Sequence, residues 1–183
     1  MGMKLLWVLF LLMLILPSGL VGATVLEEDG VKIDVPAGWE VFQKSNGGIV
    51  IALTKIMPLL PFNPGIVISR LDNLSMPQDK TELDAIVYSL SSPSQNISNI
   101  TNFKVVASAL EKKSKLGGFS YKATYDLTRV KDEKRKSVVN INYMFALKGE
   151  KFAVSLVAPE TGYKEYDKVL KSLLKSFDVV PPL

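Results

Sequence analysis

The chain has 183 residues, of which 48% are hydrophobic and 22% are charged, and its formal net charge is +4. It contains neither cysteine nor histidine. This composition excludes disulfides, zinc sites built from cysteine or histidine, haem held by histidine, and nucleophiles that rely on a histidine base. The length corresponds to one globular domain, and the hydrophobic fraction is too high for a disordered chain. The small net charge argues against a nucleic acid partner.

Residues 1–23 have the features of a signal peptide. Lys4 supplies a positive charge, and an unbroken apolar run then extends from Leu5 to Leu16. A proline and a glycine follow that run, and Val21-Gly22-Ala23 suits signal peptidase, so we expect cleavage after Ala23.

The alternative for this segment is an uncleaved membrane anchor, because residues 5–23 approach the ~20 residues that cross a bilayer. Lipoprotein anchoring is excluded, because the chain has no cysteine. Both remaining alternatives place a single domain, residues 24–183, outside the cytoplasm, either secreted or held at the outer face of the cytoplasmic membrane.

The first part of the domain predicts short strands joined by tight turns. Strands are expected over 24–26 and 31–35, and Asp29-Gly30 between them is a strong signal for a two-residue hairpin turn. Two further strands are expected over 41–43 and 49–54, around a turn that contains two glycines.

Trp39 follows the tight turn Pro36-Ala37-Gly38. Because tryptophan is usually well buried, we interpret Trp39 as a core residue beneath the first hairpin. The alternative is an accessible ring on which a ligand stacks.

The stretch Met57–Pro64 contains three prolines, which remove donors that a strand would need, so it predicts a loop. Between these prolines lie Leu59, Leu60 and Phe62. Exposed apolar side chains on a stiff loop would mark a contact site for a protein partner or a membrane surface. The alternative is that these side chains fold back over the edge of the sheet.

The middle of the chain predicts a strand over 66–71 and one amphipathic helix. The helix is expected over 81–91, beginning at Thr81 with Asp84 as its partner in a variant capping box. Its apolar stripe, which has the spacing of a helix that packs on one side, comprises Leu83, Ile86, Val87 and Leu90. Residues 91–101 are polar and predict a loop.

Four longer strands are expected next, followed by a second amphipathic helix over 162–176. The strands are expected over 103–113, 119–130, 137–147 and 152–158. Tight turns join them, which is typical of an antiparallel meander. The last strand is apolar on both faces and should be covered on both sides. These elements predict an α/β sandwich around a mostly antiparallel sheet, with helices on both faces.

Four landmarks over about residues 25–180 resemble a known family. An early hairpin leads into Val35-Pro36-Ala37-Gly38-Trp39, which is similar to a P-x-G-W turn, and a helix precedes the long strands. Leu116-Gly117-Gly118 begins a strand of small and aromatic residues, and the last helix ends in Lys175-Ser176-Phe177. In these landmarks the chain resembles the PsbP/Mog1 superfamily, in particular its prokaryotic PsbP-like members.

This resemblance implies an α-β-α sandwich with a central antiparallel sheet. Members of the superfamily share binding to a larger partner rather than a reaction, and fold alone does not carry a function from one protein to another. The resemblance therefore favours a protein that binds a protein partner and uses no cofactor. Metal-related roles of photosynthetic members would use histidines that this chain lacks.

Five lysines are expected to gather at one end of the meander. Lys112, Lys113 and Lys115 precede one hairpin turn, while Lys148 and Lys151 flank the turn two connections later. Such a basic end could meet anionic lipid headgroups or an acidic partner. The alternative is a solvated rim that prevents edge-to-edge pairing.

Two weaker patterns involve carboxylates and asparagines. Glu27-Glu28-Asp29 could offer oxygen ligands to a hard cation, although neighbouring residues of a strand point to opposite faces, which favours a purely structural role. Three triplets match the acceptor pattern for N-glycosylation and lie in expected loops. Their asparagines are Asn73, Asn96 and Asn99.

The function favoured by these observations is a non-enzymatic exported domain that binds a protein partner at or near the outer face of the cytoplasmic membrane. No phosphate-binding loop, nucleophile elbow or metal-ligand spacing is present, and no cofactor is expected. One alternative is a small-molecule or lipid carrier with a pocket between a helix and the sheet. Another is a hydrolase built on carboxylates alone, which requires two carboxylates in a cleft and a raised pKa.

Overall fold

The structure is a computed structural model that describes residues 24–46, 48–57, 62–95, 97–112, 114–128 and 135–181. The signal peptide predicted over 1–23 lies outside these residues. The described elements are β1 (Thr24–Glu28), β2 (Val31–Val35), β3 (Glu40–Asn46), β4 (Ile49–Thr54), β5 (Gly65–Arg70), α2 (Lys80–Gln95), β6 (Ile100–Leu110), β7 (Phe119–Thr128), β8 (Arg135–Leu147), β9 (Glu150–Pro159), α3 (Tyr163–Ser176) and β10 (Asp178–Val179).

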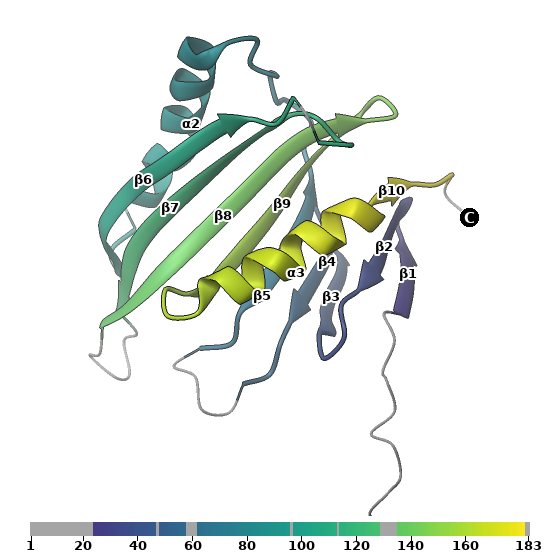
Figure 1. Cartoon of the computed structure of the whole chain (residues 1–183), viewed down its shortest axis with the longest axis horizontal. Helices are drawn as coiled ribbons and strands as arrows, with labels where there is room; N and C mark the ends of the chain where they lie inside the picture. Colours follow the sequence, from purple (N-terminus) through teal and green to yellow (C-terminus); the bar gives the residue numbers. More distant parts are fainter. Residues whose placement is uncertain are drawn as a thin grey trace, which may run out of the picture.

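Two antiparallel sheets form the framework of the domain (Figure 1). The larger sheet has seven strands in the order β3-β4-β5-β9-β8-β7-β6, and the smaller has three in the order β1-β2-β10. All neighbouring strands are antiparallel. The predicted antiparallel sheet is therefore confirmed, and a small second sheet accompanies it.

The first hairpin forms as its turn sequence predicts. Asp29 and Gly30 have φ angles of 47° and 72°, which is the paired positive φ of a type I′ turn. The C-terminal segment then joins this hairpin, since β10 pairs with β2 and the Val180 amide donates to the Gly30 carbonyl at 2.8 Å. The two ends of the described chain thus lie in one sheet.

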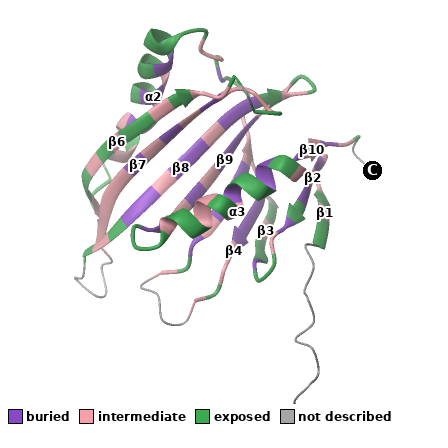
Figure 2. Ribbon diagram, in the orientation of Figure 1, coloured by how far each residue is buried: buried purple, intermediate pink, exposed green. Residues whose placement is uncertain are grey.

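Strand β9 occupies the centre of the large sheet, between β5 and β8. Its consecutive residues Phe152, Ala153 and Val154 are all buried, so both faces of the strand are covered. Figure 2 shows the same pattern, with buried residues along β8 and β9 and exposed residues on the outer side of α3. The prediction of an inner strand from an apolar run is confirmed.

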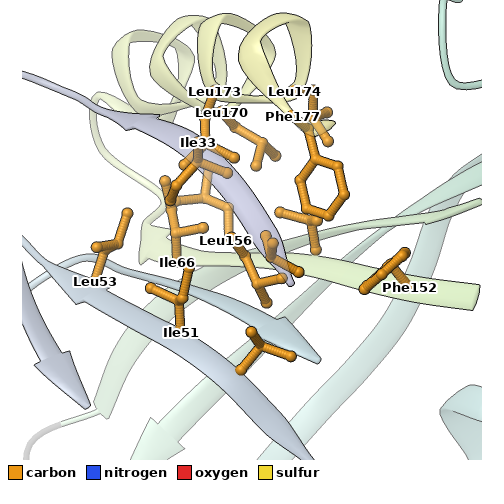
Figure 3. Close-up of a cluster of buried hydrophobic side chains, with 14 of the residues drawn as sticks. Ile33, Ile51, Leu53, Ile66, Phe152, Leu156, Leu170, Leu173, Leu174 and Phe177 are labelled. Atoms are coloured by element: carbon orange, nitrogen blue, oxygen red, sulfur yellow. The ribbon is translucent and has the colours of Figure 1, made fainter. Parts of the chain in front are cut away.

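On one face of the large sheet, α3 and the small sheet enclose the main core (Figure 3). Phe177, just after α3, packs its ring against Phe145 and Phe152, with ring centroids 4.9 Å and 5.1 Å apart. Trp39 is 6% exposed and meets Tyr166 of α3 edge to face at 6.4 Å. Trp39 is therefore a core residue, as its position after the turn suggested.

On the opposite face, α2 covers a second core near the β6 edge. Leu83 and Val87 of the helix pack with Phe119, Tyr121 and Met144 of the sheet. Helices therefore lie on both faces of the sheet, and the expected α-β-α sandwich is observed, with the small sheet added to the α3 layer.

The start of α2 differs from the prediction. Asp79, rather than Thr81, caps the helix, because its Oδ1 accepts a hydrogen bond from the Glu82 amide at 2.9 Å. Glu82 in turn accepts from the Gln78 amide at 2.8 Å. Asp84 is not a capping partner. It pairs with Lys80 one turn away, at 2.6 Å.

The end of α2 also differs, because the helix continues to Gln95 through part of the predicted loop 91–101. Pro93 lies inside the helix and has no amide hydrogen for the Ser89 carbonyl. The Ser92 hydroxyl donates to that carbonyl at 3.2 Å instead. The serine hydroxyl thus replaces the missing backbone hydrogen bond. The expectation that a proline ends a helix does not take such a side-chain donor into account.

Gly118 sits where the β6–β7 connection touches β8. Its φ angle is +82°, and a Cβ added there would lie 2.8 Å from the Phe145 Cα and would overlap the Met144 carbonyl oxygen. Gly162, with a φ of +80°, has nothing within 4 Å of the equivalent position. Backbone strain is therefore similar at the two glycines, and only Gly118 adds a steric clash.

We expect Gly118→Ala to lower the free energy of unfolding by about 3 kcal/mol, combining left-handed strain with overpacking. The matched Gly162→Ala variant should lose only about 1 kcal/mol, from strain alone. Urea unfolding followed by circular dichroism measures both. Equal losses in the two variants would contradict the steric argument.

Candidate functional site

Strands β6, β7 and part of β8 extend beyond α3 (Figure 1), and two cavities that share Tyr143 form a groove on this side of the sheet. The groove exists because β7 presents polar side chains and β8 presents apolar side chains on the face toward α3. Ser120 pairs with Tyr143 and Lys122 with Ile141, so the polar side of β7 lies next to the apolar side of β8. The apolar side of β7 packs toward α2 instead.

One part of the groove is a cavity of ≈ 470 Å³ at the end of α3. Its floor comes from Tyr143 and Phe145 of β8, and its walls come from α3 and the β6–β7 connection. The lining residues are Glu111, Ser114, Lys115, Leu116, Gly117, Tyr143, Phe145, Lys171, Leu174 and Lys175. Three lysines thus surround a largely apolar floor.

Hydrogen bonds fix the polar groups of this cavity. The Ser120 hydroxyl donates to Glu111 at 2.6 Å, and Lys171 donates to Asp167, one turn earlier on α3, at 2.6 Å. The bond to Asp167 raises the pKa of Lys171, which keeps it charged. Burial, and then the negative charge of Glu111, raise the pKa of Tyr143, so its phenol stays neutral.

A smaller cavity of ≈ 220 Å³ continues the groove toward the start of α3 and shares Tyr143 with the first. Lys122 crosses it from β7, donating to the Tyr163 hydroxyl at 3.4 Å, with its ammonium 5.1 Å from the ring centroid. This second cavity is more polar than the first, and the contact between Lys122 and Tyr163 partly bridges it.

The structure separates the five lysines predicted for the basic end. The two turns do lie at the same end of the sheet, because β6 with β7 and β8 with β9 are antiparallel pairs. Lys115 lines the groove, while Lys112 is exposed beside Met76 and Pro77 in a different hollow. Lys113 lies outside the described residues.

The two remaining lysines have local roles. Lys148 pairs with Asp178 at 3.0 Å and donates to the Val179 carbonyl at 2.6 Å, so it fastens β10. Lys151 is half-buried, and its carbonyl accepts from the Leu71 amide at 2.8 Å.

Lys171 and Lys175 are functional candidates that the sequence analysis missed. They are spaced four residues apart on α3, beside its apolar stripe, and this spacing was the available signal. Lys171 and Lys175 line the same cavity as Lys115 because the end of α3 lies next to the β6–β7 connection. No local sequence pattern predicts where the helix ends relative to that connection.

An apolar corner lies on the edge strand β3 of the large sheet and consists of the consecutive residues Val41 and Phe42. Their side chains are 37% and 77% exposed, respectively. Phe42 is the extra residue of a β-bulge, since Val41 pairs with Leu53 and Gln43 with the adjacent Ala52. The bulge breaks the alternation of the strand, which is why sequence patterning did not single out Phe42.

The predicted contact loop follows β4, and Ile56, which is 55% exposed, lies just before it. The Met57 amide donates to Asn63 Oδ1 at 3.0 Å and the Lys55 amide to the Pro64 carbonyl at 3.1 Å, so the two arms of the loop run together. Phe62 is half-buried. Leu59 and Leu60 lie outside the described residues, so the hypothesis for this loop stays a prediction.

The three carboxylates of the first turn contact three different cations. Glu27 pairs with Lys32 at 2.9 Å and Glu28 with Lys44 at 3.2 Å. Asp29 pairs with Arg70 at 3.0 Å, and Arg70 also reaches Glu150 at 2.6 Å. The carboxylates therefore diverge, and within the described ranges no three acidic side chains are grouped to hold a metal ion.

Of the three asparagines in glycosylation triplets, Asn73 is exposed and Asn99 is half-buried in a turn. The Asn99 carbonyl accepts from the Thr128 amide at 2.9 Å, which ties that turn to the end of β7. Asn96 lies outside the described residues. Of the two described asparagines Asn73 is thus the more accessible, and modification of all three stays a prediction.

Among the described residues, the carboxyl groups of Asp84, Asp126 and Asp178 have lowered pKa values. A hydrogen bond from Lys80 lowers the pKa of Asp84, one from Asn102 that of Asp126, and one from Lys148 that of Asp178. A hydrolase that uses a carboxylic acid as a proton donor needs the opposite shift, so these three groups do not suit that role.

None of the helices in the part of the chain that the structure describes is long and apolar enough to cross a membrane.

Comparison with solved structures shows a shared fold at low sequence identity. A Mog1 variant matches with a TM-score of 0.54 and 13% identity, covering 86% of this chain and 96% of that chain. The Saccharomyces cerevisiae Ran-binding protein Mog1p gives 0.52 and 13%, with the same coverage. Cyanobacterial PsbP (CyanoP) from Synechocystis gives 0.51 and 14%, covering 89% and 95%.

No protein-family profile and no curated protein matches the sequence. The structural likeness nevertheless establishes a PsbP/Mog1-like fold over most of the chain, as the sequence landmarks implied.

The ion pair between Lys148 and Asp178 gives a testable pH dependence. Because the pKa of Asp178 is lowered in the folded state, the pair contributes stability above the ordinary value of 3.8, and this contribution is lost as the pH falls below it. We expect Lys148→Met to raise the pKa of Asp178 toward that value and to flatten the loss of stability in acid. Carbon-detected NMR titration of Asp178 measures the shift, with Lys164→Met as the control. An unchanged pKa in Lys148→Met would refute the assignment.

Proposed function

We propose that the domain is a non-enzymatic, exported protein that binds a protein partner at or near the outer face of the cytoplasmic membrane. The observation that carries the proposal is the apolar corner. A phenylalanine that is 77% exposed, together with Val41 next to it in the strand, leaves apolar surface in water that a partner would cover.

The surroundings of the apolar corner suit a protein partner. Glu40 and Lys44 on the same edge strand are exposed and charged, so the apolar side chains have a polar rim. Aromatic residues at the centre of such a patch carry a large share of the binding energy in protein complexes. Phe42 is therefore the residue on which we expect binding to depend most.

The fold supports the same class of function without specifying the partner. One protein with this fold is named as a Ran-binding protein, which is an example of a protein-binding role on this framework. The export part of the proposal rests on the sequence, with Lys4 before an apolar run that extends from Leu5 to Leu16. Contact with the membrane surface is part of the proposed location.

In-cell photo-crosslinking tests the proposal, with a photoreactive residue placed at Phe42 in one strain and at Tyr88 in another. Tyr88 is 71% exposed on α2 and serves as the matched control for exposed aromatic surface. We expect one recurring protein adduct from position 42 and not from position 88. Mass spectrometry identifies the adduct.

A serine variant of Val41 completes this test. Adding Val41→Ser should reduce the position-42 adduct by about tenfold, because it removes apolar contact from the same interface. Near-ultraviolet circular dichroism should show an unchanged fold. Identical adducts from both positions, lipid adducts alone, or no effect of Val41→Ser would overturn the assignment of this surface.

A further inference from the structure

The cavity at the end of α3 has the properties of a ligand site. Its volume of ≈ 470 Å³ lies within the range of about 300–1,000 Å³ that is usual for small-molecule pockets. Leu116 and Tyr143, which are half-buried, supply the accessible apolar surface, and the buried side chains of Phe145 and Leu174 lie beneath it. The floor is part of the main core, so it is preformed rather than assembled on binding.

The rim of this cavity is positively charged. Lys115, Lys171 and Lys175 line it, against a single carboxylate, Glu111. Lys171 is paired with Asp167, and Glu111 accepts from Ser120. Lys115 and Lys175 make no ion pair with any residue in the described ranges, so two ammonium groups are open to a ligand, although the charge of Lys115 also contributes to the lowered pKa of Asp178.

These two lysines come from different walls. Lys115 belongs to the β6–β7 connection and Lys175 to the last turn of α3. A carboxylate has two oxygens and can accept a charge-assisted hydrogen bond from each side. Tyr143 is also part of the lining, and its neutral phenol offers a third donor.

We infer that this cavity binds a free, single-chain organic carboxylate, with its apolar body on Leu116 and Tyr143 and its head group between Lys115 and Lys175. The inference does not depend on the proposed protein partner. The apolar corner is on β3, at the opposite edge of the large sheet from β6.

Isothermal titration calorimetry with decanoate tests the inference, on protein purified without detergent from the exported fraction. We expect saturable binding of decanoate, and binding of decyltrimethylammonium at least about tenfold weaker, because the rim repels a cationic head group. Vesicles of phosphatidylglycerol form a third arm, which separates a free carboxylate from an anionic lipid surface.

The double variant Lys115→Ala/Lys175→Ala should weaken decanoate binding by about tenfold, since each charge-assisted hydrogen bond at a solvated rim contributes modestly. Lys164→Ala/Lys168→Ala removes the same charge from residues of α3 that do not line the cavity, and should change binding less than about twofold. Both variants should retain the near-ultraviolet spectrum.

Four results would overturn the inference. These are no saturable decanoate binding, equal binding of the cationic probe, equal effects of the two double variants, and binding to vesicles alone. None of them bears on crosslinking at Phe42, so failure of this site and failure of the partner proposal are distinguishable.

Discussion

The register between β7 and β8 is the constraint on which the rest of the site depends. Ser120 lies opposite Tyr143, and Phe119 opposite Met144, so the apolar side of β7 and the aromatic floor of β8 are on different faces of the sheet. A slip of one residue would exchange these faces and expose the second core. Because α2 needs the apolar side of β7, the polar side must remain beside α3. The open groove is therefore a consequence of covering both faces with helices of limited length.

The C-terminal segment converts this open face into a cavity with a basic rim. Phe177 anchors the end of α3 between Phe145 and Phe152, which sets the height of the last helical turn above the sheet. Lys148 then fastens β10 through the Val179 carbonyl. The lysines of α3 reach the β6–β7 connection only because these contacts hold the helix end in place. Aromatic packing thus determines where the charges lie.

Local signals in the sequence were enough for most of the framework. The Asp29-Gly30 turn and the run over 152–158 each fix their own conformation, through paired positive φ angles and burial on both faces. The cap of α2 was misplaced because Thr81 and Asp84 imitate a capping box, whereas Asp79 and Glu82 form the actual hydrogen bonds.

Phe42 and the groove were missed for a different reason. A bulge breaks the strand pattern at Phe42, and the groove joins segments far apart in the chain.

The strand order also separates the two proposed binding surfaces. β3 and β6 are the opposite edges of the large sheet, and β9 lies between them with both faces buried. Ligands at two sites affect each other only through a coupling free energy, which requires an element with two arrangements that both sites bias. A central strand packed on both sides offers little freedom for such an element. A partner at the apolar corner and a carboxylate beside α3 are therefore expected to bind independently, as two functions carried by one rigid sheet.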